Sequence, residues 1–223
     1  MLTKSCPTAK LALFLCAGLL VSCTTYSGSA DNPIERSLTW FSYVAGDDIK
    51  ASCAAGSRDH FRFVYNAVYQ KQIRAYDMKG VDAGADLVAR VRNEPGNVSG
   101  FRIQDPLGPW ALAESRASIS NEQASDIVDA LSRDAERAPA SAGQQLASNE
   151  FYWIVSGCSA GSFRIWAFDQ DRVGVNALEF ASELRALDGT DIDFRNAMPV
   201  EGFDDGVFYI KINQTGDGTV RGF

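Results

Sequence analysis

The sequence predicts an α+β fold, a predominantly antiparallel β-sheet domain accompanied by two helices. Three observations predict it. Several short segments alternate between apolar and polar residues, as strands with one buried face do. Turn-forming Pro and Gly residues separate many of these segments. Helical periodicity appears only in the second half of the chain, from Ser120 to about Arg137 and from Ala177 to Leu187.

The first half of the chain contains the longer run of expected strands. They are residues 38–44, 60–66, 68–77, 86–92, 99–104 and 111–119. The first is aromatic and β-branched, and the second and third alternate clearly enough to predict a hairpin. In the second, Phe61, Phe63 and Tyr65 share one face, and Arg62 and Val64 share the other.

The second half combines helices with further strands. Ser120 is a typical N-cap, Ile127 and Leu131 lie on one apolar stripe of the helix that follows, and Pro139 lies beyond its end. The remaining elements are expected strands at 151–156, 162–169 and 206–213 and a helix at 177–187. Residues 139–148 are either a surface loop or a linker between two halves, 36–137 and 149–223, of one domain spanning 36–223.

Two short segments resemble each other. Cys53-Ala54-Ala55-Gly56-Ser57 and Cys158-Ser159-Ala160-Gly161-Ser162 each precede a Phe and an Arg and follow an aromatic segment. A duplicated hairpin with the two cysteines at equivalent turns explains this similarity. A chance similarity of two Gly-Ser turns explains it equally well.

The N-terminus has the organisation of a secretory signal. Residues 1–10 contain Lys4 and Lys10 and no acid, and residues 11–21 are apolar. A helix needs about 20 apolar residues to span a bilayer. Since the polar residues Thr24 and Thr25 soon follow, this segment is too short to be a permanent transmembrane anchor.

The end of this segment, Leu20-Val21-Ser22-Cys23, resembles the bacterial lipobox. The resemblance implies that residues 1–22 are removed and that the Cys23 thiol receives a diacylglycerol, with residues 23–35 forming a lipidated tether. Two or three acyl chains, such as palmitate, anchor stably because each buried CH₂ contributes about 0.8 kcal/mol. Thr24, rather than Asp, favours the outer membrane by the rule of enteric-type bacteria. An ordinary secretory signal cut after Ser22 is the alternative.

Charge argues against a nucleic-acid partner. The chain has 21 basic and 28 acidic residues, and loss of Lys4 and Lys10 with the signal leaves 19 and 28, a net charge of −9. Such a chain repels a polyanion.

The cysteines divide in an informative way. Cys6 and Cys16 leave with the signal and Cys23 is acylated, so Cys53 and Cys158 remain as a pair in an oxidising compartment. We expect a disulfide between them, which by chain-entropy models stabilises the fold by roughly 4–5 kcal/mol. Two separate buried thiols are the alternative.

Two motifs are relevant to catalysis. Gly157-Cys158-Ser159-Ala160-Gly161 fits the G-x-S-x-G elbow of α/β-hydrolases, but a strand follows it and the only histidine, His60, lies far upstream. A tight turn is the simpler interpretation. Cys158 and His60 are similar to the thiol–imidazole dyad of L,D-transpeptidases, although Val155 occupies the place of their conserved serine and a disulfide would consume the thiol.

No metal or cofactor is predicted. One histidine and two paired cysteines make no zinc set. Asp188-Gly189-Thr190-Asp191-Ile192-Asp193 has acids that could reach a calcium ion, but it lacks the register of a calcium loop and a Glu at position twelve. A polar turn after a helix is the simpler interpretation.

One candidate binding surface follows from the strand pattern. Basic residues on the expected strands could share one solvent-facing side of the sheet, where guanidinium groups bind phosphate or carboxylate. They are Arg62, Lys71, Arg74, Arg90, Arg92 and Arg102. Interleaved acids such as Asp77 and Asp86 could instead neutralise them pairwise.

Taken together, these features predict a non-catalytic lipoprotein, lipid-anchored in the outer membrane and facing the periplasm. The membrane is its first expected partner, and other envelope proteins or peptidoglycan are further candidates. The alternative is an enzyme acting on peptidoglycan or esters through Cys158 and His60 or through Ser159.

Overall fold

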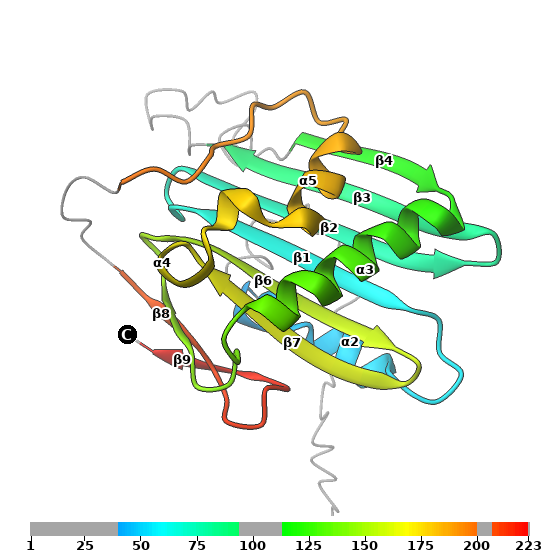
Figure 1. Cartoon of the computed structure of the whole chain (residues 1–223), viewed down its shortest axis with the longest axis horizontal. Coiled ribbons are helices and arrows are strands. Elements are labelled where there is room, and N and C mark those ends of the chain that lie inside the picture. Colours follow the sequence, from blue (N-terminus) through cyan, green and yellow to red (C-terminus); the bar gives the residue numbers. More distant parts are fainter. Residues whose placement is uncertain (1–39, 94–112, 200–206, 223) are drawn as a thin grey trace, which may run out of the picture.

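The computed structural model describes residues 40–93, 113–199 and 207–222. Its centre is a six-stranded antiparallel sheet in the order β4-β3-β2-β1-β6-β7 (Figure 1). The strands are β1 (His60–Ala67), β2 (Gln72–Val81), β3 (Gly84–Asn93), β4 (Ala113–Ile119), β6 (Phe151–Ser159) and β7 (Ser162–Asp169). The predicted α+β class is confirmed. Because β1 pairs with β6, strands from both halves of the chain belong to one sheet.

Two helices cover one face of this sheet. They are α3 (Asn121–Arg137) and α5 (Glu179–Ala186), with the short α4 (Gln170–Val173) and η3 (Val175–Ala177) between β7 and α5. Ser120 and Gln123 form a capping box at the start of α3, so each satisfies a backbone N–H of the other. Ile127 and Leu131 of α3 and Leu184 of α5 are buried against the sheet. Burying each such side chain stabilises the fold by roughly 1.5–3 kcal/mol.

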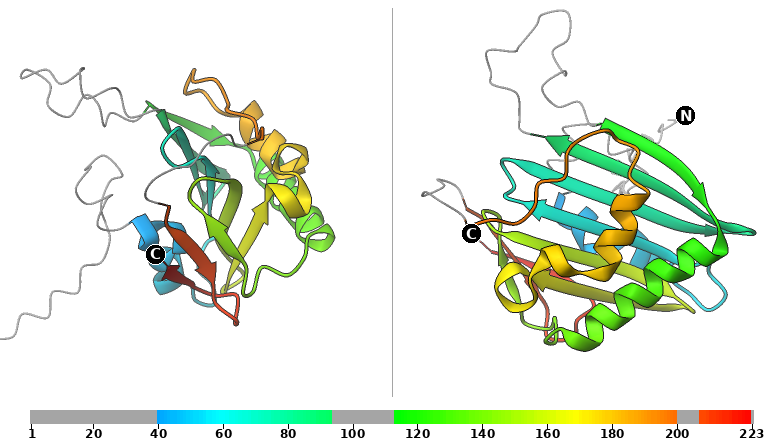
Figure 2. Two further views of the ribbon diagram at one scale, coloured as in Figure 1. Left: turned by 90° about the vertical axis from the view of Figure 1, so that its left-hand side faces the viewer. Right: turned by 45° about the horizontal axis from the view of Figure 1, so that its top comes forward.

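The opposite face is covered by residues 40–52, which we call the N-terminal layer, and by a second, smaller sheet. Residues 40–45 are helical and are followed by α2 (Asp47–Ser52). The small sheet consists of β5 (Gln145–Ala147), β8 (Tyr209–Ile212) and β9 (Thr219–Gly222), in the order β5-β8-β9. Seen from the side in Figure 2, the large sheet lies between this layer and the helices. On this face Asp86, Arg116 and Ser118 of β3 and β4 are exposed.

The expected strand at residues 38–44 is wrong over the part that the structure describes, because residues 40–45 are helical. Trp40, Tyr43 and Val44 are all buried against the sheet. Their spacing of three and four residues places them on one side of a helix. Aromatic and β-branched residues favour strands only weakly, and burial of this stripe outweighs that preference.

The expected strand at residues 68–77 begins later than predicted. Ala67 pairs directly with Gln72, so residues 68–71 form the turn. Val68 adopts a left-handed φ of 61°, which is costly for a β-branched residue, and its N–H donates to the carbonyl of Glu150 at 3.3 Å. The hairpin itself is confirmed.

The other expected elements have mixed outcomes. The strands at 60–66, 86–92, 111–119, 151–156 and 162–169 and both helices are confirmed with small shifts of their ends, and the strand at 206–213 contains the shorter β8. The expected strand at 99–104 lies outside the described residues. The expected loop at 139–148 ends in β5, and β9 was not expected.

A buried charge network fixes the N-terminal layer to the sheet. Arg62, with a side chain only 4% exposed, donates through Nη1 and Nη2 to both carboxylate oxygens of Asp48 at 2.8 and 2.9 Å. Its Nε donates to Asp77 at 2.8 Å, and its guanidinium lies 3.9 Å from the ring centroid of Tyr43. The Tyr43 hydroxyl also donates to Asp77, at 2.9 Å. One arginine therefore connects α2, the residues before it and two strands.

We expect Arg62→Leu to lower the free energy of unfolding by about 3–5 kcal/mol, because it removes the counter-charge of the partly buried Asp48 and the shortest ion pair of Asp77. Arg58→Leu is the matched control. Arg58 pairs with Asp82 at the surface, where the two side chains are 57% and 91% exposed, and such pairs contribute less than about 1 kcal/mol. Urea unfolding of both variants measures the difference. Equal losses of unfolding free energy in the two variants would contradict a role for this network in holding residues 40–52 against the sheet.

Candidate functional site

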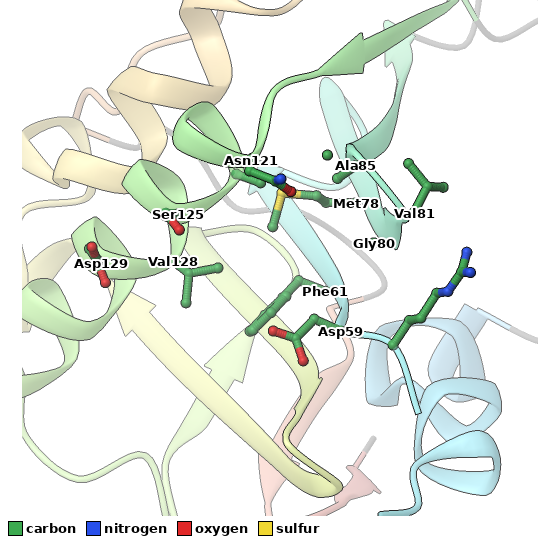
Figure 3. Close-up of a pocket in the computed structure, with 13 residues that line it drawn as sticks. Asp59, Phe61, Met78, Gly80, Val81, Ala85, Asn121, Ser125, Val128 and Asp129 are labelled. Carbon is green, nitrogen blue, oxygen red and sulfur yellow. The ribbon is translucent and has the colours of Figure 1, made fainter. Parts of the chain in front are cut away.

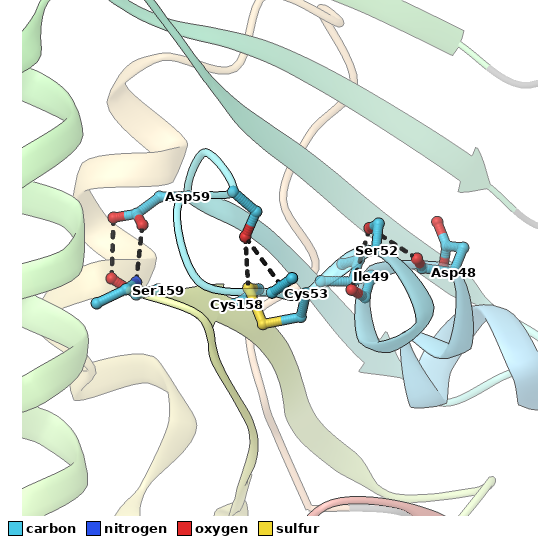
Figure 4. Close-up of a disulfide and its surroundings, with 10 residues drawn as sticks. Asp48, Ile49, Ser52, Cys53, Asp59, Cys158 and Ser159 are labelled. Carbon is cyan, nitrogen blue, oxygen red and sulfur yellow. Dashed lines mark hydrogen bonds between the residues drawn. A yellow bond between two sulfur atoms is a disulfide. The ribbon is translucent and has the colours of Figure 1, made fainter.

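A disulfide joins Cys53 to Cys158, 105 residues apart in the sequence (Figure 4). Cys53 follows the last residue of α2, and Cys158 lies near the end of β6. The predicted pairing is confirmed. Disulfides form and persist in oxidising compartments, so the bond indicates an oxidising, extracytoplasmic environment.

The two similar Cys-to-Ser segments are not a duplicated hairpin. Cys53 begins a loop between a helix and β1, whereas Cys158 lies inside β6, ahead of the tight turn into β7. They do pack against each other. A Cβ atom at Gly161 would lie 2.8 Å from the backbone nitrogen of Ala55, and Gly161 has a φ of +75°. The turn thus requires glycine both for its conformation and for this close approach.

The Asp59 carboxylate binds the turn between β6 and β7, close to the disulfide. Its carboxylate accepts a hydrogen bond from the Ser159 hydroxyl at 2.9 Å and one from the Ala160 N–H at 3.3 Å (Figure 4). Ser159 ends a strand and is followed at once by a turn and another strand. The G-x-S-x-G segment is therefore a hairpin turn held by a carboxylate, as the simpler interpretation predicted.

His60 lies close to the disulfide but on a different side from Ser159. The strand register places His60 opposite Cys158, and its Nε2 is 3.5 Å from Asp77, which belongs to the face that carries Arg62. Ser159 alternates to the other face of β6. The Cys158 sulfur is bonded to Cys53, so the thiol–imidazole dyad would require the disulfide to be reduced.

Asp77 is the most heavily paired carboxylate of this region. Burial alone would raise the pKa of Asp77, but the charge of Arg62 and the contacts from His60 and Tyr43 hold it well below its ordinary value. Burial and the nearby charge of Asp77 raise the pKa of the Tyr43 hydroxyl. Asp77 therefore stays ionised and Tyr43 neutral.

The predicted arginine face is not one solvent-facing surface. Arg62 and Arg74 are buried, with 4% and 2% exposure, and the register places Arg74 on the opposite face from Arg62. Strand alternation shows which face a side chain takes, but the layers that cover each face come from distant parts of the chain.

The remaining basic residues of that prediction are also dispersed. Arg90 shares the Arg62 face and pairs with Glu114 at 2.8 Å and with Asp77 at 3.3 Å. Arg92 donates to the carbonyl of Tyr69 and lies 4.4 Å from its ring centroid. Lys71 is in the turn before β2, and Arg102 lies outside the described residues. Of the interleaved acids, Asp77 pairs with Arg62 and Arg90. The partner of Arg74 is instead Asp188, which follows α5 in the sequence.

A groove of about 410 Å³ opens between α3 and the ends of β1, β2 and β3 (Figure 3). Phe61, Met78 and Val128 line it with apolar surface, and the exposed carboxylates of Asp59 and Asp129 lie along it. No histidine or cysteine is among the described residues that line it. Arg58, which pairs with Asp82, also lines the groove, so an apolar floor is combined with charged groups of both signs.

The acidic segment that begins at Asp188 follows α5 and is held by hydrogen bonds within the fold. Asp188 accepts hydrogen bonds from the Tyr76 hydroxyl at 2.7 Å and from the Thr190 hydroxyl at 2.6 Å, and it pairs with Arg74. Burial opposes ionisation, but these donors lower the pKa of Asp188. Over the described ranges, no group of three His, Cys, Asp or Glu residues is arranged to hold a metal ion. The polar-turn interpretation is confirmed for Asp188.

Two further arginines join Arg74 on the helix side of the sheet, and sequence reasoning missed both. Arg185 is on α5, and Arg195 lies in the segment that follows it. The guanidinium of Arg185 is 3.6 Å from the ring centroid of Phe194, and that of Arg74 is 5.1 Å from it. Tyr65 donates its hydroxyl to the carbonyl of Arg195 at 2.9 Å. We call Arg74, Arg185 and Arg195 the arginine cluster.

Comparison with known proteins identifies no relative. No protein-family model matches the chain, and neither curated proteins nor solved structures contain a match. In the portion of the chain that the structure describes, no helix is long and apolar enough to cross a membrane. Functional inference therefore rests on the residues themselves.

We expect Gly161→Ala to destabilise the protein more than Gly174→Ala. Both glycines have φ near +70°, so each substitution forces a left-handed conformation that costs roughly 1–2 kcal/mol. Only Gly161 is crowded, since nothing lies within 4 Å of a Cβ built at Gly174. Thermal unfolding of the two variants separates the clash with Ala55 from the backbone cost, and equal melting temperatures would contradict the packing described for the two turns.

Proposed function

We propose that this protein is a lipid-anchored lipoprotein of the bacterial cell envelope, a structural or binding module that faces the periplasm. The observation that carries the proposal is the Cys53–Cys158 disulfide. It leaves Cys23 as the one cysteine after the signal segment without a sulfur partner, at the position where the lipobox resemblance places the diacylglycerol. The bond also agrees with the oxidising compartment that such an anchor implies.

The state of the reactive side chains supports a non-catalytic role. The Cys158 sulfur is consumed in the disulfide, and a cysteine nucleophile needs a free thiolate. The Ser159 hydroxyl donates to the Asp59 carboxylate, and a carboxylate is a far weaker base than the imidazole that commonly activates a serine nucleophile.

The groove beside α3 supports a binding role. It combines a buried apolar floor at Phe61 and Met78 with the exposed carboxylates of Asp59 and Asp129. Small-molecule and peptide sites commonly have this composition, an apolar lining with a few polar groups that fix orientation. A tether over residues 23–35 would hold this surface near the membrane, and Thr24 favours the outer one.

One observation favours a second function. The register sets His60 opposite Cys158, and His60 is 3.5 Å from Asp77, so reduction of the disulfide would place a thiol near an imidazole that has a carboxylate neighbour. This is the arrangement of a thiol enzyme. It requires a reduced, accessible Cys158, whereas Cys158 is 2% exposed.

Cys23→Ala should release the protein from the membrane fraction into the soluble periplasm, because the acyl chains provide the anchoring energy. Metabolic labelling with a radioactive fatty acid should mark the wild type and not the variant. Cys53→Ser, which removes a cysteine outside the lipobox, is the control and should keep the label. A Cys23→Ala variant that stays membrane-bound would contradict the lipid anchor.

The denatured, unreduced mature protein, which lacks Cys6 and Cys16, should react with no thiol reagent, because Cys23 is acylated and the other two cysteines are bonded. Cys158→Ser should lower the free energy of unfolding by about 2–5 kcal/mol, and His60→Ala should preserve the biological function. Two reactive thiols, or a specific loss of function in a folded His60→Ala variant, would favour the thiol enzyme instead.

A further inference from the structure

The arginine cluster has more positive charge than the surrounding residues neutralise. Its three side chains meet around Tyr65 and Phe194, whose rings stack with centroids 4.7 Å apart. Burial raises the pKa of the Tyr65 hydroxyl, and the charges of Arg185, Arg195 and Arg74 each lower it. All three guanidiniums are therefore within electrostatic reach of one hydroxyl group.

Only one carboxylate of the described residues contacts this cluster. Asp188 pairs with Arg74, and Arg74 also donates to Gln72 and to the carbonyl of Ile192. Arg74 is thus satisfied. Arg185 and Arg195 form no ion pair within the described part of the chain, so no described residue supplies a counter-charge for either of them.

Some hydrogen-bond donors of these two arginines also lack an acceptor. Nε and Nη2 of Arg185 and Nε of Arg195 are buried and have no acceptor among the described residues. Arg185 donates once, through Nη1 to the Asn196 side chain at 3.3 Å. Burial lowers the pKa of Arg185, and the charge of Arg74 lowers it further. Leaving buried charged donors without acceptors is costly, and folded proteins rarely do so.

The two arginines are at the edge of the core. Arg185 and Arg195 are half-buried residues, and Asn196, whose side chain accepts from Arg185 Nη1, is exposed. The segment that contains Arg195 leaves α5 as the orange trace of Figure 1. Because none of the described residues compensates this charge, an anion is the group that would satisfy it, and the planar fork of a guanidinium matches the two oxygens of a carboxylate or phosphate.

We propose that Arg185 and Arg195 bind the carboxylate or phosphate group of a small anionic ligand, with Arg74 and Asp188 positioning the segment that carries Arg195. The site is separate from the groove beside α3 and does not depend on the lipid anchor. Phe194 supports the Arg185 guanidinium from its ring face, so the Nε and Nη2 donors that lack an acceptor lie along the edge of the guanidinium. The binding is non-covalent and requires no cofactor.

The test uses the full-length protein purified in mild detergent. Inorganic phosphate and acetate are added at constant ionic strength against sodium chloride, and the melting temperature is followed. A ligand that binds only the folded state at 100 times its Kd should raise the melting temperature of the wild type by about 5–10 °C. The larger response of the two anions identifies phosphate or carboxylate as the preferred group.

Arg185→Gln and Arg195→Gln should each weaken binding at least tenfold by calorimetric titration with the preferred anion, since a charge-assisted hydrogen bond contributes about 1.5–3 kcal/mol. Arg164→Gln, at an exposed arginine on β7, is the control and should respond as the wild type. Circular dichroism confirms that each variant is folded, and Arg185→Lys provides a milder change if Arg185→Gln is not.

Three results would overturn the proposal. They are a wild type that responds to neither anion beyond chloride, folded Arg185→Gln and Arg195→Gln variants that bind as the wild type does, and a loss of binding in Arg164→Gln that matches theirs. The membrane fractionation of Cys23→Ala is independent of all three, so failure of this site and failure of the lipid anchor can be told apart.

Discussion

The pairing of β1 with β6 is the contact on which both layers of the molecule depend. These two strands are buried on both faces. Their side chains on one face belong to one hydrophobic core, and their side chains on the other face belong to a second. Phe63 and Trp153 face the helices, whereas Val64 and Ile154 face the small sheet and the N-terminal residues. A shift of this register by one residue would move the side chains of one core to the other face of the sheet. The β1–β6 register therefore determines both cores and the position of Cys158.

Arginines have two different roles in this fold, and whether a carboxylate pairs with them distinguishes the two. Arg62 is surrounded by Asp48 and Asp77 and stabilises the attachment of the N-terminal layer. Arg185 and Arg195 have similar aromatic and polar surroundings but lack a carboxylate within the described residues. A paired buried charge fixes a structure, while Arg185 and Arg195 need a group that the described residues do not supply. That difference separates the structural network from the proposed anion site.

Much of the fold could be predicted from local patterns, whereas the site could not. Alternation found most strands of the large sheet, and the Ser120 cap marked the start of α3, because both signals act within a few residues. Residues 40–45 misled the prediction because burial against the sheet, a long-range effect, decided their conformation. The same cause buried Arg62 and Arg74. Arg185 and Arg195 have no sequence signal at all, since their significance lies in counting the acids near them after folding.

The N-terminal layer also connects the lipid anchor proposed above to the centre of the sheet. A chain held at Cys23 enters the described fold at Trp40, whose ring is buried in the second core. Further along the chain, Asp48 is attached to the sheet by its ion pair with Arg62, and Cys53 is attached to β6 by its disulfide with Cys158. The disulfide joins the end of this layer covalently to a central strand. With the anchor proposed above in place, a pull on the tether would be transmitted to β6 through this covalent bond as well as through residues 54–59 and β1.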